Sequence, residues 1–225
     1  MYDLSGNVAG PKRRAVARTL FVIPLIVLGL ASTDAKANGI TFSAPTSFNV
    51  FWNFVTPTSS DPLTANATFN VTSFTSSQVD MTLTVRNTTP NYVVSSMGFN
   101  TNPAVTASLT SAGSVFTGVA NDTNFPGFQT IEVCAFTSSN CSSSANPLAL
   151  QANSQDTFGL SLTGTFSNSL TLSTFAMKFA GGPDGSFEVG GKVPLPATLL
   201  LFAGGFAAFI AWNQYNRRST SIGLS

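Results

Sequence analysis

The sequence predicts an all-β protein whose central part, residues 38–192, folds as an antiparallel, jelly-roll-like β-sandwich. Apolar and polar residues alternate in several stretches of this part, a pattern that is typical of half-buried strands. Turn-forming pairs such as Asn102-Pro103 and Asn146-Pro147 separate these stretches. No stretch between them has a convincing helical period. We therefore expect about eight to ten antiparallel strands.

The alternation also predicts which side chains lie in the core. In residues 79–86 every second residue is apolar, and the residues between them are polar or charged. Similar alternation occurs three more times along the central part. The residues expected to point inward are Val79, Met81, Leu83, Val85, Phe69, Val71, Phe158, Leu160, Leu162, Phe175, Met177 and Phe179.

Small uncharged side chains supply most of the polarity. Ser, Thr and Asn make up 74 of the 225 residues, whereas Asp, Glu, Lys and Arg make up 8%. An average soluble domain has about 25% charged residues. Thr has a high strand propensity, so a sheet surface accounts for much of this composition. A surface with so few charges favours self-association or stacking on polysaccharide.

The composition excludes several classes of site. The chain has no histidine and two cysteines, which excludes a histidine-based triad, an ordinary zinc site and a four-cysteine iron–sulfur cluster. We therefore expect no metal and no cofactor. The net charge of +1 gives no sign of the basic surface that binds nucleic acid, so no nucleic-acid partner is expected.

Residues 1–37 are typical of a secretory signal peptide. Four basic residues between positions 12 and 18 precede Leu20–Leu30, a run without polar side chains. Ala35 and Ala37 then provide the small-x-small pattern that signal peptidase cleaves. Because a helix of this length covers about 16 Å, roughly half of a bilayer core, a permanent span is not expected. We expect export through the Sec translocon and cleavage after Ala37.

A second apolar stretch, residues 197–212, is followed by Arg217 and Arg218. Its residues cover about 24 Å as a helix, which predicts a single, marginal transmembrane helix. Basic residues stay on the cytoplasmic side, and they lie outside both apolar stretches. Residues 38–192 are therefore an exported ectodomain with three basic and seven acidic residues, a net charge of −4, and residues 219–225 are a short cytoplasmic tail.

The C-terminal segment, residues 193–218, resembles a known sorting signal. Val193-Pro194-Leu195-Pro196-Ala197, an apolar helix and an arginine pair together resemble the PEP-CTERM signal of bacterial exported proteins in its VPLPA variant. Leu195 replaces the glutamate of the commonest form, and Ser219–Ser225 follow the arginine pair instead of ending the chain there.

This resemblance implies a partner and a destination. The partner is exosortase, an integral-membrane cysteine transpeptidase that recognises Val193–Ala197 and cuts near the proline motif. The apolar helix holds the chain in the membrane until then, and Arg217 and Arg218 act as the cytoplasmic stop. The processed protein moves to the cell surface or extracellular matrix, commonly in bacteria that produce exopolysaccharide.

Cys134 and Cys141 are expected to form a local disulfide, because an even pair at close spacing in an oxidising compartment is most simply a bridge. An eight-residue ring would stabilise the fold by about 2–3 kcal/mol. A free thiol pair or a metal pair are the alternatives. The segment also resembles the two-cysteine loop of the cistern subgroup of PEP-CTERM proteins.

No catalytic residue is predicted, so the protein is not expected to be an enzyme. Without histidine, catalysis would depend on carboxylates, and the acidic residues form no recognisable pair. Asp80 is expected on the solvent face of a strand and Asp184 in a turn. Asp156 and Glu132 are expected at exposed strand positions.

The aromatic cluster of Phe48, Phe51, Trp52 and Phe54 could stack on sugars or fill the core, and the core is favoured. The expected function is a structural or adhesive role in the cell surface or matrix, in association with exopolysaccharide. The alternatives are a carbohydrate-binding module, a secreted carboxylate-dependent glycan hydrolase and a plain single-pass anchored surface protein.

Overall fold

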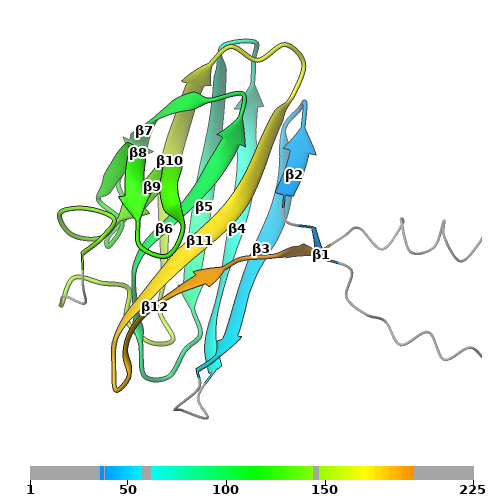
Figure 1. The fold of residues 1–225 in the computed structure, drawn as a ribbon. Coiled ribbons are helices and arrows are strands. Elements are labelled where there is room, and N and C mark those ends of the chain that lie inside the picture. The colour runs from blue at the N-terminus through cyan, green and yellow to red at the C-terminus, as the bar shows by residue number, and fades with distance from the viewer. Residues whose placement is uncertain (1–35, 38, 57–61, 144–146, 195–225) are drawn as a thin grey trace, which may run out of the picture. The chain divides into compact units, whose positions relative to one another are not determined.

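The computed structural model describes residues 36–37, 39–56, 62–143 and 147–194. They belong to the compact unit Asp34–Ser225, and the other unit of the chain, Met1–Thr33, lies outside them. The described residues form strands, turns and loops without a helix, and their strands pair antiparallel (Figure 1). The all-β prediction is confirmed for this part. The predicted transmembrane helix and nearly all of the predicted signal peptide lie outside it.

Two large sheets make up the domain. The five-stranded sheet contains, in spatial order, β3 (Thr46–Val55), β4 (Pro62–Phe74), β5 (Gln78–Asn87), β10 (Gln155–Gly164) and β7 (Val105–Ser111). The six-stranded sheet contains β12 (Gly185–Gly190), β11 (Leu170–Gly182), β6 (Val93–Asn102), β9 (Gln129–Phe136) and β8 (Gly118–Phe125), with β2 (Gly39–Phe42) also paired to β11. A short ladder joins β1 (Lys36–Ala37) to β13 (Val193–Pro194).

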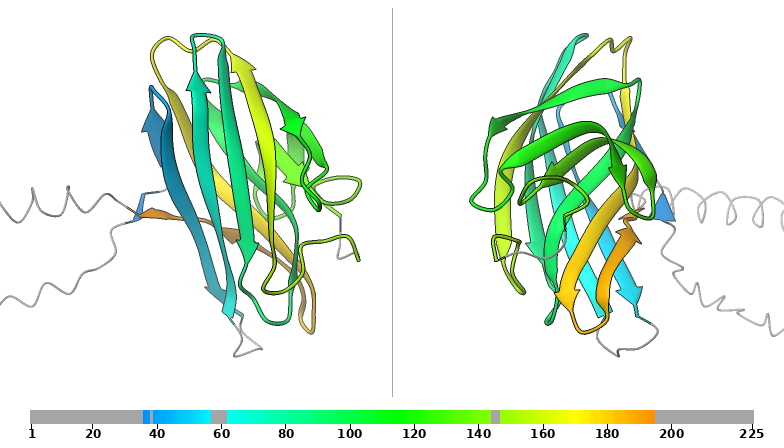
Figure 2. Two further views of the ribbon diagram at one scale, coloured as in Figure 1. Left: turned by 180° about the vertical axis from the view of Figure 1, so that it is seen from behind. Right: turned by 60° about the vertical axis from the view of Figure 1, so that its left-hand side comes forward.

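The two large sheets pack face to face as a sandwich. In the left view of Figure 2, β3, β4, β5 and β10 lie side by side in front, and β11 crosses behind them. The chain passes from one large sheet to the other after β2, β5, β6, β7, β9 and β10. Turns close the hairpins within each sheet: Phe125-Pro126-Gly127 lies where β8 joins β9, and Gly181–Gly185 lies where β11 joins β12.

Phenylalanine side chains fill the space between the sheets. Phe69 of β4 stacks on Phe48 of β3 with ring centroids 4.9 Å apart. Across the sandwich, Phe69 makes edge contacts with Phe99 of β6 at 5.8 Å and with Phe175 of β11 at 5.6 Å. All twelve side chains that alternation placed inward are buried in this core.

A second, small core lies outside the sandwich. Phe125, Ile131, Cys134, Cys141 and Ala176 are all buried in a cluster separate from the main core. The six-stranded sheet is therefore covered on both faces near β8, β9 and β11.

Asp156 holds the loop between β7 and β8 in place. Its side chain is 5% exposed, and its carboxylate accepts hydrogen bonds from the Ser114 hydroxyl and from the backbone N–H groups of Ser114, Val115 and Phe116, at 2.7–2.9 Å. The expectation of an exposed strand position was therefore wrong for Asp156. Burial pushes the pKa of Asp156 upward, but these hydrogen bonds outweigh burial and hold the pKa below its ordinary value.

We predict that Asp156→Asn lowers the free energy of unfolding by about 1–3 kcal/mol at pH 7, because the loop loses a charged acceptor. The folded-state pKa lies below the unfolded-state pKa, so the unfolded chain takes up the proton first as the pH falls. The carboxylate's contribution is therefore complete above about pH 4 and shrinks in more acid solution. Denaturant unfolding of wild type and variant between pH 7 and pH 3 measures this difference.

Asp80→Asn is the control, because Asp80 lies on the outer face of β5 and its carboxylate accepts one hydrogen bond, from Gln78 at 2.8 Å. It should change stability little at any pH. If the difference in the free energy of unfolding between wild type and Asp156→Asn stayed constant down to pH 3, the role assigned to the charge of Asp156 would be contradicted.

Candidate functional site

The predicted sorting motif begins where the folded domain ends. Val193 and Pro194 form β13, which pairs with β1 so that Ala37 lies opposite Val193 and Lys36 lies opposite Pro194. The structure therefore brings the predicted signal-cleavage residue Ala37 beside the first residue of the motif. The remaining predicted residues, Ala35, Leu195, Pro196, Ala197, Arg217 and Arg218, lie outside the described part.

Backbone hydrogen bonds fix the segment that leads into the motif. The Lys192 N–H donates to the Phe51 carbonyl at 2.9 Å, and the Phe51 N–H donates to the Lys192 carbonyl at 3.0 Å. Val193 is 5% exposed and belongs to the main core, whereas Pro194 is exposed. This segment therefore covers the middle of β3, which is otherwise an edge strand.

Gly191 lets this segment pass close to the core. A Cβ at this position would lie 2.7 Å from Trp52 Cε2 and 2.7 Å from Val50 Cγ1, closer than side-chain carbons approach one another. The Gly191 N–H donates to the Phe175 carbonyl at 2.7 Å, which ties this segment to β11. Glycine is needed here because the backbone runs directly over the indole ring.

A groove of about 400 Å³ lies beside residues 191–194, which are called the docked segment below, on the outer side of β3 and β4. Its walls include Phe51, Asn53, Thr64, Asn66, Thr88 and Lys192. Phe51 is 44% exposed, because Val50 and Trp52 on either side of it point into the core. The volume falls within the range of small-ligand sites.

The aromatic cluster is divided between core and surface. Phe48 and Trp52 are buried, as favoured from the sequence, whereas Phe54 is 40% exposed like its neighbour Phe51. Trp52 therefore offers no exposed ring for sugar stacking. The alternation of Phe48, Val50 and Trp52 was the sequence signal that could have placed Phe51 outside.

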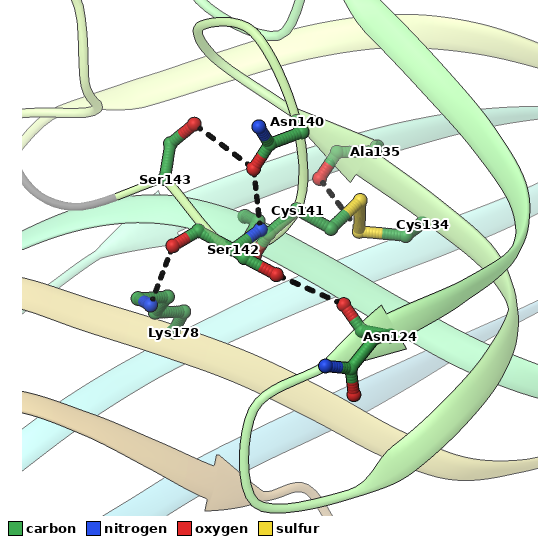
Figure 3. The surroundings of a disulfide bond; sticks show 9 residues. Asn124, Cys134, Ala135, Asn140, Cys141, Ser142, Ser143 and Lys178 are labelled. Carbon is green, nitrogen blue, oxygen red and sulfur yellow. Dashed lines mark hydrogen bonds between the residues drawn. A yellow bond between two sulfur atoms is a disulfide. The ribbon is translucent and has the colours of Figure 1, made fainter.

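The sulfur atoms of Cys134 and Cys141 lie at disulfide distance, with the Cα atoms 6.3 Å apart, as predicted. Figure 3 shows the loop after β9 returning over the outer face of the six-stranded sheet. Ser142 in this loop accepts a hydrogen bond from Lys178 Nζ at 3.0 Å through its carbonyl, and its hydroxyl donates to the Asn124 carbonyl at 3.1 Å.

Lys178 was not predicted as a buried residue. Its side chain is 7% exposed beneath the disulfide loop, and Nζ lies 3.4 Å from Glu188 Oε1. A buried charge needs such a partner, because loss of hydration is costly. No local pattern around Lys178 indicates its burial, since the loop that covers it comes from residues 36 positions earlier.

The described carboxylates contact separate sets of neighbours. Glu132 accepts hydrogen bonds from the backbone N–H and the hydroxyl of Thr101, and Asp184 accepts hydrogen bonds from the hydroxyls of Tyr92 and Thr56 at 3.3 and 3.4 Å. Glu132 is half-buried on β9, which differs from the exposed position expected. Asp80 and Asp184 lie where predicted, on an outer strand face and in a turn. Within the described ranges, His, Cys, Asp and Glu form no group of three that could hold a metal ion.

Comparison with known proteins found no match: no family model, no curated protein and no solved structure matches the chain. The described ranges contain no helix that could cross a membrane, and residues 197–212 lie outside those ranges.

We predict that Gly191→Ala lowers the free energy of unfolding by about 1–3 kcal/mol, since the added methyl group must displace the Trp52 ring or lift the segment that leads into the motif. Thermal or denaturant unfolding measures the loss, and a change in Trp fluorescence would report displacement of the ring.

Gly190→Ala is the matched control. A Cβ at Gly190 would meet Phe128 at 3.8 Å, an ordinary contact distance, so this variant should remain within about 1 kcal/mol of wild type. Equal stability of Gly191→Ala and wild type would contradict the close passage of residue 191 over Trp52.

Proposed function

We propose that this chain is an exported bacterial protein that exosortase sorts to the cell surface or extracellular matrix. One observation carries the proposal: the VPLPA motif starts at the last strand of a folded sheet domain, and the apolar stretch and arginine pair follow it in sequence. The bond that a membrane enzyme cuts must be accessible, so it must lie beyond the buried part of the domain. Val193 is the last described buried residue, and Pro194 is already exposed.

The pairing of β1 with β13 supports the two processing points. Lys36–Ala37 and Val193–Pro194 lie side by side, so the segments that would enter the membrane leave the domain at one place. Signal cleavage after Ala37 would remove β1. The docked segment would keep its hydrogen bonds to β3, which involve Lys192 and Phe51 and no residue of β1.

For the ectodomain we propose a jelly-roll-like sandwich with a structural or adhesive role in a matrix that contains exopolysaccharide. The repeated passage of the chain between the two sheets supports this type of sandwich. Thr and Asn side chains pair across the outer face of the five-stranded sheet, as in the contacts of Thr68 with Asn49 at 2.7 Å and of Thr84 with Thr157 at 2.9 Å. Such a face is polar and nearly uncharged, which suits contact with hydroxyl-rich polymers.

We predict that intact-mass analysis of the protein from the cell surface shows loss of residues 1–37 and of a C-terminal piece that begins between Val193 and Thr198. Because Val193 is packed in the core, we expect the cut after Pro194, so that the mature chain keeps Val193 and Pro194. Recovery of surface protein with its tail intact to Ser225 would instead support the plain single-pass anchor.

The matched variant for this measurement is Arg217→Ala with Arg218→Ala. Loss of both cations removes the cytoplasmic stop, so retention in the membrane and tail removal should both fall. Lys192→Gln is the control, because it removes a cation from the ectodomain side of the motif and should leave tail removal unchanged. Unaltered sorting of the double arginine variant would count against a tripartite signal.

A further inference from the structure

We propose that the groove beside β3 binds an acidic polysaccharide, with Phe51 as the stacking platform and with Lys192 and Arg86 as the cations that select carboxylate-bearing sugars. The inference rests on the proposed function, because it assumes that the domain meets exopolysaccharide. It goes further by naming a site and a chemical class of polymer.

Phe51 is a rigid, half-exposed aromatic residue on the outer face of the sandwich. Its backbone makes hydrogen bonds in both directions with Lys192, and it pairs with Asn66 across the β3–β4 ladder. Because the Phe51 backbone is paired on both sides, it is already ordered before a ligand binds, so binding costs little further conformational entropy. An exposed ring of this kind offers a flat apolar surface to the C–H face of a sugar.

Two cations flank this ring. Lys192 lies directly across the β3 edge from Phe51 and lines the groove. On the other side, Asn66 pairs with Arg86 of β5, so Phe51, Asn66 and Arg86 form one row across three strands. Adjacent strands lie about 4.8 Å apart, which places Arg86 about 10 Å from Phe51 along the row.

The charges around the groove favour an anionic ligand. Neither Lys192 nor Arg86 forms an ion pair with another described residue. The described carboxylate on the same face of β5, Asp80, is six residues from Arg86, a distance of about 20 Å along the strand. The ectodomain has a net charge of −4, whereas the two charged residues beside the groove are both cations. Carboxylates along a polymer would be complementary to these two cations.

Polar side chains complete the site. The amides of Asn53 and Asn66 make no hydrogen bond with other described residues, so they can donate to and accept from sugar hydroxyls. The hydroxyl of Thr88 donates to that of Thr64 at 2.8 Å, which holds these two residues together in the wall of the groove. An open groove with an aromatic platform and a few polar groups suits one stretch of an extended polymer.

The test is affinity electrophoresis of the purified full-length protein in detergent, through gels that contain alginate, a polyuronic acid. The matched probe is carboxyl-reduced alginate, which keeps the sugar backbone and lacks the charge. We expect retardation by alginate, at least tenfold weaker retardation by the reduced polymer, and weakening by added salt. Phe51→Ala and Lys192→Gln should each weaken alginate binding about tenfold, and Arg86→Gln should weaken it less because Arg86 lies farther from the groove.

Phe54→Ala is the matched control, because Phe54 is a similarly exposed aromatic residue on the same strand and does not line the groove. It should bind alginate like wild type. Equal effects of Phe51→Ala and Phe54→Ala, or equal binding of both polymers, would overturn the proposal. So would a Phe51→Ala variant that loses self-association, measured by light scattering, but keeps alginate binding, since the groove would then hold a second copy.

Two further readouts separate this proposal from the proposed function. Melting temperatures of Phe51→Ala and Lys192→Gln close to wild type show that lost binding is not lost folding. The intact mass of the wild-type protein from cells reports tail removal independently of alginate binding. A wild-type protein that binds alginate but keeps its tail contradicts the sorting proposal alone, whereas a wild-type protein that loses its tail but does not bind alginate contradicts the groove proposal alone.

Discussion

The contact between the two sheets at Phe69 is the interaction on which the rest of the structure depends. Phe69 stacks on Phe48 within one sheet and makes edge contacts with Phe99 and Phe175 of the other. The described residues include no helix and a single ion pair, so apolar burial between the sheets supplies most of the stabilisation. Polar groups that are buried, such as Asp156, fix individual loops onto this core.

Because the inner faces carry the stability, the outer faces can differ from one another. On the six-stranded sheet, the disulfide loop covers Lys178 and a second small core. On the five-stranded sheet, the outer face stays open, and the docked segment at Lys192 adds a groove to its edge. The passage of Gly191 over Trp52 links this groove to the core, so Val193 and Pro194, the first residues of the proposed sorting motif, are part of the folded domain.

Much of the sandwich could be predicted from the sequence, because alternation is a local property of each strand. The inward faces of β4, β5, β10 and β11 follow from it directly, as does the disulfide from the spacing of its cysteines. The burial of Asp156 and Lys178 could not be predicted, since each is covered by a loop that is distant in sequence. The groove was missed for the same reason: Phe51 and Lys192 meet only when β3 and the end of the ectodomain come together.

Amide hydrogen exchange at Lys192 in the full-length chain tests most directly whether the folded domain extends to the start of the proposed sorting motif. The Lys192 and Phe51 amides donate to each other's carbonyls, so both should exchange as slowly as amides in the interior of the β3–β4 ladder. Protection at Lys192 that matched Phe51 would support a motif that emerges from a fixed edge of the fold. Exchange of Lys192 at the rate of an unstructured peptide would contradict it, and with it the placement of the groove and of the processing point.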